Sequence, residues 1–150
     1  MRHSGSCHCG AITIVFETRK DPAALGVRAC QCGFCRRHGA LTTSDANGAA
    51  RVEASARDLI RYRFGFMTCD FLICARCGVY AAAAIGEGQG IRATLNVAGL
   101  AMADFATLAP TLVDYSAETE ALRSDRRGRL WTPTQFADEN LAAAKFGTAE

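Results

Sequence analysis

The sequence predicts a mainly β protein that forms one domain across its 150 residues. Short segments in which apolar and polar residues alternate favour this class, and turns that contain glycine or cysteine separate them. Hydrophobic residues make up 49% of the chain, which is enough for a packed core at this length. We expect the core over about residues 4–115 and a helical tail over about residues 116–150.

The alternating segments follow one another along the first two thirds of the chain. The clearest one runs from residue 11 to 17, where Ile12, Ile14 and Phe16 share one face. Similar patterns predict strands over residues 11–17, 27–30, 41–44, 51–54, 59–64, 70–73, 79–84 and 91–97.

The tail has a different pattern. Ser116 is a candidate N-cap for a helix with acidic residues in its first turn and arginines near its end. We interpret the charged run from Arg123 to Arg129 as the solvent-exposed face of this helix, and anion binding is the lesser alternative. An amphipathic segment from Gln135 to Phe146 predicts a second helix that stops at Gly147.

Charge and cysteine content narrow the class of protein. The net charge of +2 gives no reason to expect a nucleic-acid or membrane-surface protein. The first residues are polar and unlike a signal peptide, so we expect a cytoplasmic location. Thiols stay reduced there, and the eight cysteines therefore indicate metal binding rather than disulfides.

Four cysteines form two closely spaced pairs, each followed by a glycine: Cys7, Cys9, Cys74 and Cys77. Glycine at these places suits a tight turn with positive φ that directs backbone amides towards sulfur. We expect the four thiolates to surround one metal ion in a closed, structural, tetrahedral site. Zinc is the commoner guest of such a shell, and iron is the alternative.

The middle cluster supplies three thiolates within six residues: Cys30, Cys32 and Cys35. Three protein ligands and one vacant position are typical of a catalytic zinc site. Two other residues would close the site if they reached it. His38 follows Cys35 at ligand-like spacing, and Cys69 precedes Cys74 by five residues. The alternative interpretations are a surface histidine and a small buried apolar side chain.

Three blocks carry a resemblance to a known family. They read GSCHCGA over residues 5–11, CQCGFCRRHGA over 30–40 and FLICARCG over 71–78. In order and spacing they resemble the glutathione-dependent formaldehyde-activating enzyme family, which also includes centromere protein V. The likeness covers about residues 4–100 and a Trp-Thr-Pro ending at 131–133. It implies a β-tent of several coiled antiparallel sheets around zinc, and two zinc ions per chain divided between the cysteines as above.

The resemblance also implies an activity. It is that of a carbon–sulfur lyase resembling S-(hydroxymethyl)glutathione synthase, which joins a small thiol such as glutathione to an aldehyde such as formaldehyde. Cys30, Cys32 and Cys35 would be the catalytic residues, because zinc held by three thiolates lowers the pKa of a bound thiol.

Other groups near this cluster in the sequence are candidates for substrate binding and proton transfer. Arg36 and Arg37 are candidates for binding the carboxylates of glutathione, and a solvated pair is the alternative. His38 and Asp70 are the nearest candidates for a general base. The rival functional interpretation is a non-catalytic, zinc-stapled binding module or a thiol-rich metal or redox sensor.

Overall fold

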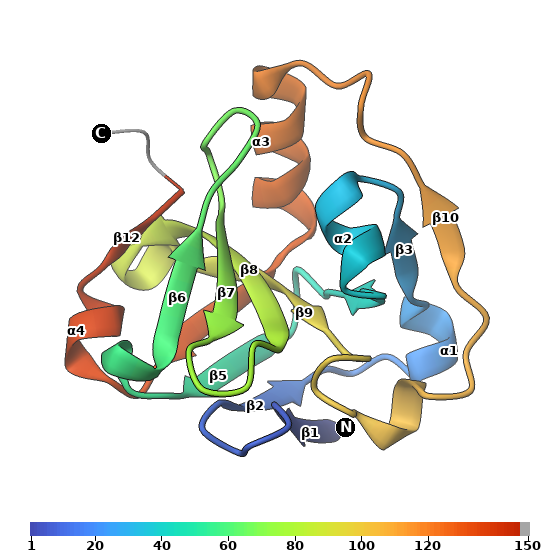
Figure 1. Cartoon of the computed structure of the whole chain (residues 1–150). Coiled ribbons are helices and arrows are strands. Elements are labelled where there is room, and N and C mark those ends of the chain that lie inside the picture. Colours follow the sequence, from blue (N-terminus) through green and yellow to red (C-terminus); the bar gives the residue numbers. More distant parts are fainter. Residues whose placement is uncertain (148–150) are drawn as a thin grey trace.

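The computed structural model describes residues 1–147 and shows a mainly β architecture, with twelve strands in one mixed sheet (Figure 1). The strands are β1 (Arg2–Ser6), β2 (Thr13–Glu17), β3 (Arg28–Cys30), β4 (Thr42–Thr43), β5 (Ala49–Glu53), β6 (Leu59–Tyr62), β7 (Asp70–Cys74), β8 (Tyr80–Glu87), β9 (Arg92–Asn96), β10 (Thr111–Val113), β11 (Thr132–Phe136) and β12 (Lys145–Phe146). The α-helices are α1 (Pro22–Leu25), α2 (Gly33–Arg37), α3 (Glu120–Leu130) and α4 (Glu139–Ala142). Every strand predicted from the alternating patterns is present, with shifted ends.

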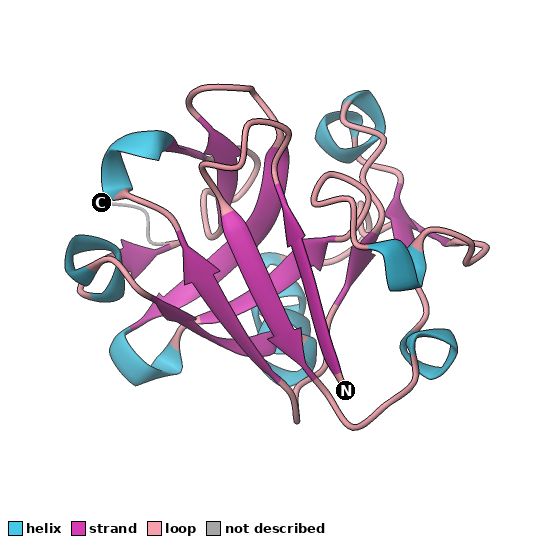
Figure 2. Cartoon of the chain, turned by 90° about the horizontal axis from the view of Figure 1, so that it is seen from below, coloured by secondary structure: helices cyan, strands magenta, loops and turns pink. Residues whose placement is uncertain are grey.

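Two sections of the sheet meet at β11. The first has the order β1-β2-β5-β11, and Figure 2 shows this side of the molecule from below. In the second section, β9 pairs with β8 along one edge, and with β11 and β4 along the other. The pairings of β3 with β10 and of β5 with β11 are parallel, whereas the resemblance implied antiparallel sheets.

The predicted alternation places the core. Ile14 lies opposite Val52 and Phe16 lies opposite Ala50 across the β2–β5 pair, and all four side chains are buried. The apolar run of β8 has a different cause. This strand lies between β7 and β9, and its residues Tyr80–Ala84 are buried on both faces.

The N-terminal strand β1 was missed because it is polar and has no alternating pattern. It pairs with β2 along its full length, so that Gly5 faces Ile14 across the ladder. Close packing requires a glycine at position 5, because a Cβ there would lie 2.3 Å from the carbonyl oxygen of Leu100. The strand ends at Ser6, directly before Cys7 of the first cysteine pair.

The predicted helix over Gln135–Phe146 was wrong. The segment contains the end of β11, the one-turn helix α4 and strand β12. In β11 the side chains of Thr132, Thr134 and Phe136 are buried while Gln135 between them is exposed, which is the period of a strand. Because β11 lies between β5 and β9, the C-terminal segment completes the sheet instead of extending from it.

Helix α3 was predicted, but its cap was wrong. The N-cap is Thr119, whose hydroxyl accepts a hydrogen bond from the Leu122 amide. Ser116 lies before the helix, and its amide donates to the Asp114 carboxylate. With eleven residues, α3 is the longest helix in residues 1–147, and none of the helices there has the length and apolar character needed to cross a membrane.

Candidate metal centres

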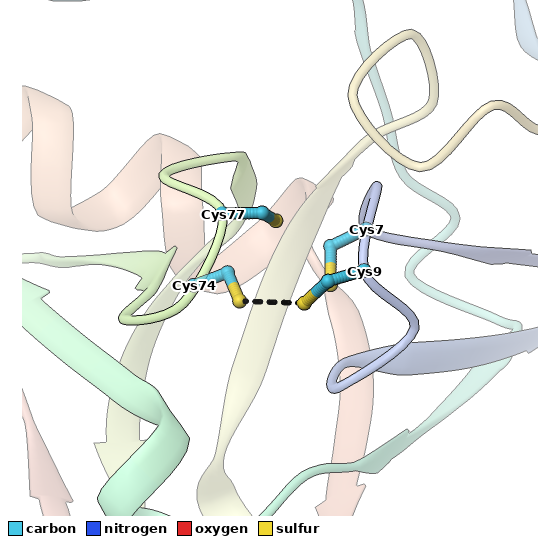
Figure 3. A group of neighbouring side chains, drawn as sticks. All are labelled: Cys7, Cys9, Cys74 and Cys77. Atoms are coloured by element: carbon cyan, nitrogen blue, oxygen red, sulfur yellow. Dashed lines mark hydrogen bonds between the residues drawn. The ribbon is translucent and has the colours of Figure 1, made fainter.

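The first cysteine group joins two distant turns. Cys7 and Cys9 lie between β1 and β2, Cys74 is the last residue of β7, and Cys77 lies in the turn between β7 and β8. The four sulfur atoms face one another (Figure 3). The Sγ atoms of Cys7 and Cys9 are 3.8 Å apart, and those of Cys9 and Cys74 are 3.6 Å apart. Four sulfurs at about 2.3 Å around a tetrahedral zinc would lie about 3.8 Å from one another. The group therefore fits a tetrahedral thiolate site for a metal ion.

Both turns have the backbone form that the sequence predicted. Gly10 has φ +80° and Gly78 has φ +78°, a region that side chains rarely adopt. The turns aim amides at sulfur, as the Ile12 amide does at the Cys7 Sγ over 3.3 Å. These local features explain why each pair carries a following glycine.

The thiols of this group titrate together. The Ala11 amide lowers the pKa of Cys9, but burial and the neighbouring thiols outweigh it and raise that pKa to about 11. Desolvation raises the pKa of Cys77, but the amides of Val79 and Cys9 and the neighbouring thiols lower it to about 6. A cation would be needed to hold all four sulfurs as thiolates at neutral pH.

The second group is built on one strand end and one short helix. Cys30 ends β3, Cys32 is the N-cap of α2, and Cys35 lies inside that helix. The Cys35 amide donates to the Cys32 Sγ over 3.3 Å, and the three sulfur atoms lie within 4.8 Å of one another. Hydrogen bonds from the Cys30 and Cys35 thiols hold the pKa of Cys32 far below its ordinary value. Hydrogen bonds with the Cys30 thiol first, and then with the Cys32 thiol, raise the pKa of Cys35.

The two residues that would have closed this group lie elsewhere. His38 is exposed at the end of α2, where its ring centroid is 4.5 Å from that of Phe34. Cys69 is buried, its thiol faces the Asp70 carbonyl, and burial raises its pKa to about 12. In residues 1–147, the second group of potential ligands therefore consists of the three cysteines alone.

A cavity of about 290 Å³ opens beside the second group, and Cys30, Cys32 and Cys35 all lie on its wall. Its apolar side is formed by Phe64, Phe71, Tyr80, Ala83 and Trp131. The first group does not line it. Of the two cysteine groups, only the group of three therefore lines this cavity.

The sequence did not predict the arginines of this cavity. Arg28 from β3 and Arg123, Arg126 and Arg127 from α3 all line it. The interpretation of 123–129 as a solvated face was therefore wrong for three residues and holds for Arg129, which is exposed and pairs with Asp125. A signal was available, because residues three and four apart share one face of a helix.

Arg123 and Arg126 share one carboxylate, that of Glu118. The Nε of Arg126 donates to Glu118 over 2.6 Å, and its guanidinium lies 3.5 Å from the centre of the Tyr115 ring. Arg123 donates to the same carboxylate over 3.4 Å. Together they lower the pKa of Glu118, the Arg126 hydrogen bond most, so this carboxylate stays charged.

Other candidates from the sequence lie outside the cavity. Arg36 and Arg37 are exposed, and Arg37 donates to the Gly33 carbonyl over 2.9 Å. Asp70 is fully buried and holds ion pairs with Arg61 and Arg63. In contrast, Tyr80 lies on the cavity wall, and sequence reasoning did not select it.

Comparison with known proteins gives one family. The model of the glutathione-dependent formaldehyde-activating enzyme family matches residues 2–117. A crystal structure of a Rhodobacter sphaeroides protein is similar, with 33% identity over 71% of this chain and 91% of that chain and a TM-score of 0.49. Among curated proteins, none matches the chain.

Proposed function

Because the chain belongs to the family of glutathione-dependent formaldehyde-activating enzymes, we propose that it is a zinc-dependent carbon–sulfur lyase of that kind. It joins the thiol of glutathione, or of a similar small thiol, to formaldehyde or another small aldehyde. The sulfur forms a bond to the aldehyde carbon while the carbon–oxygen double bond becomes a single bond, and the proton lost by the thiol is balanced by the one that the oxygen gains. The product is an S-hydroxymethyl thiol, and the reaction is reversible.

One observation carries this proposal: the group with only three thiols is the one that lies on the cavity wall. A four-thiolate shell leaves a zinc ion no position for substrate, whereas a three-thiolate shell does. We assign Cys7, Cys9, Cys74 and Cys77 to a structural zinc, and Cys30, Cys32 and Cys35 to a catalytic one. The zinc bound there would lower the pKa of a thiol that enters the cavity.

The residues around the three cysteines have separate tasks in this proposal. The aromatic side chains of Phe64, Phe71 and Trp131 restrict water in the cavity. Tyr80 is the candidate donor to the aldehyde oxygen, since it lines the cavity and its side chain is buried. Burial raises the pKa of Tyr80 well above its ordinary value, so its hydroxyl keeps its proton at neutral pH.

The test compares two cysteine variants. We expect Cys32→Ser to lose most of the glutathione-dependent consumption of formaldehyde and to hold about one zinc per chain instead of two. Cys69→Ala is the matched control, because it removes a buried thiol outside both groups and should retain activity and both metal ions. An unaltered chain that consumes formaldehyde no faster than the spontaneous reaction would refute the activity.

A further inference from the structure

Arg127 is a buried cation that lines the cavity without a carboxylate partner in residues 1–147. Its exposed fraction is 9%, and its Nη1 donates to the Thr68 hydroxyl over 3.2 Å. Its guanidinium carbon lies 5.3 Å from the centre of the Trp131 ring. The Nε atom is buried and has no hydrogen-bond partner there. This guanidinium therefore keeps a buried donor without a partner there, in a residue that lines both this cavity and a second one of about 250 Å³ beside Thr68 and Ser124.

Arg28 also contacts only uncharged groups in the described part of the chain. Its Nη2 donates to the hydroxyl of Ser44 over 2.8 Å and to that of Thr94 over 3.5 Å. It reaches the cavity from β3, while Arg127 reaches it from α3. Two cations from different elements thus line the cavity without the carboxylate that Arg123 and Arg126 share.

A charge count around the cavity supports a missing anion. The four arginines are balanced in part by Asp114 on the wall and by Glu118. Three thiolates around a divalent cation would add one further negative charge. One positive charge is left over, and a buried cation is costly unless an anion pairs with it. Burial accordingly lowers the pKa of Arg127.

We propose that Arg127, assisted by Arg28, forms a carboxylate-binding subsite that makes the cavity selective for thiols carrying a carboxylate. The planar guanidinium suits a carboxylate because two parallel hydrogen bonds can form. This inference rests on the proposed function, since it names the class of thiol that the same cavity accepts. Helix α3 begins after the family-matched residues 2–117, so Arg127 is a feature of this chain beyond that match.

The test uses a probe that cannot react. S-methylglutathione has its thiol blocked, and in its dimethyl ester an uncharged methyl ester replaces each of the two carboxylates. Binding of both to the zinc-loaded protein is measured by calorimetry, with the fluorescence of Trp131, the single tryptophan, as a second signal. We expect the acid to bind at least about tenfold more tightly than the ester, as one charge-assisted hydrogen bond would give.

Three variants locate the effect. Arg127→Gln should weaken binding of the acid roughly 10- to 100-fold and leave binding of the ester unchanged. Arg127→Lys keeps the positive charge without the planar guanidinium. It should retain part of the preference for the acid over the ester, even if the glutamine variant fails to fold. Arg129→Gln is the matched control, since Arg129 lies on the same helix, is exposed and does not line the cavity. Circular dichroism and zinc content verify the fold of each variant.

The outcomes separate this inference from the proposed reaction. Equal binding of acid and ester by the unaltered protein would overturn the subsite, even if the protein consumes formaldehyde. So would a folded Arg127→Gln variant that keeps the full preference. A preference that depends on Arg127 supports the subsite even if no formaldehyde is consumed, because the assay contains neither an aldehyde nor a free thiol.

Discussion

Single side chains around the second cysteine group have roles that their neighbours determine. Cys32, Cys35 and Cys69 are chemically alike, yet the first two share a cavity wall and the third is buried against a carbonyl group. Hydrogen bonding lowers the pKa of Cys32, while burial raises that of Cys69. Their difference therefore arises from position and not from residue type.

Tyr80 gives a prediction at this scale. Tyr80→Phe removes the proposed donor to the aldehyde oxygen and leaves the ring in the core, so we expect kcat to fall roughly 10- to 100-fold. Glutathione binding and zinc content should stay close to those of the unaltered protein. Steady-state kinetics measure the effect, and an unchanged kcat would exclude Tyr80 from the chemical step.

Asp45 gives a prediction about pH. Desolvation raises its pKa, but hydrogen bonds from Thr18, the Asn47 amide and Lys20 outweigh this and lower it. A depressed pKa means that this carboxylate stabilises the fold above its unfolded pKa of about 3.9 and loses that effect as the pH falls through its lower folded value.

We therefore expect Asp45→Asn to lower the free energy of unfolding at pH 7 by about 1–3 kcal/mol, and by less near pH 3. Urea unfolding at the two pH values measures both numbers. Asp21→Asn is the control, because Asp21 precedes helix α1 without capping it through its side chain. An equal loss at both pH values would show that the charge of Asp45 is not the cause.

At the scale of elements, α3 connects the fold to the cavity. Its cap at Thr119 sets where the helix starts, and hence which arginines face inward. Three of them line the cavity, while Arg129 points to solvent. The exposed interpretation of the charged run failed because a helical pattern gives spacing but not the direction in which a face points.

The cap can be tested directly. Thr119→Ala should destabilise the protein by about 1 kcal/mol, because it leaves the Leu122 amide without its side-chain acceptor. Ser116→Ala is the matched change at the residue that the sequence suggested, and should cost less, since its hydroxyl is not the N-cap group. Thermal unfolding of both variants decides between them, and a larger loss from Ser116→Ala would restore the sequence-based assignment.

At the scale of the whole molecule, the four-cysteine group joins the N-terminal hairpin to the β7–β8 turn. The residues it unites are more than sixty positions apart along the chain. A metal ion held there would stabilise the complete fold, because the unfolded chain has no preformed site. The three-cysteine group lies within one short segment and would constrain the chain less.

Metal removal should reflect this difference. We expect a strong zinc chelator to lower Tm by about 10 °C or more. Cys74→Ser should reproduce most of that loss, and Cys32→Ser should reproduce a smaller part. Calorimetric scans at fixed protein concentration measure the three values. A larger loss from Cys32→Ser than from Cys74→Ser would reverse the structural and catalytic assignments.

The sequence alone determined the features that depend on local spacing. Alternation of apolar residues predicted the strands that build the core, because the period of a strand is two residues. The spacing of the cysteines and their following glycines separated the group of four from the group of three. The structure brings the members of each group together as two separate clusters. The motifs around them also identified the family.

Only the tertiary structure decided the features that depend on which distant segments meet. In the structure β11 pairs with both β5 and β9. His38 and Cys69 are not part of the three-cysteine group. Three arginines of α3 line the cavity. None of these follows from spacing along the chain. Each depends on how elements from different parts of the sequence bury their apolar faces together, and therefore on the packing of the whole core.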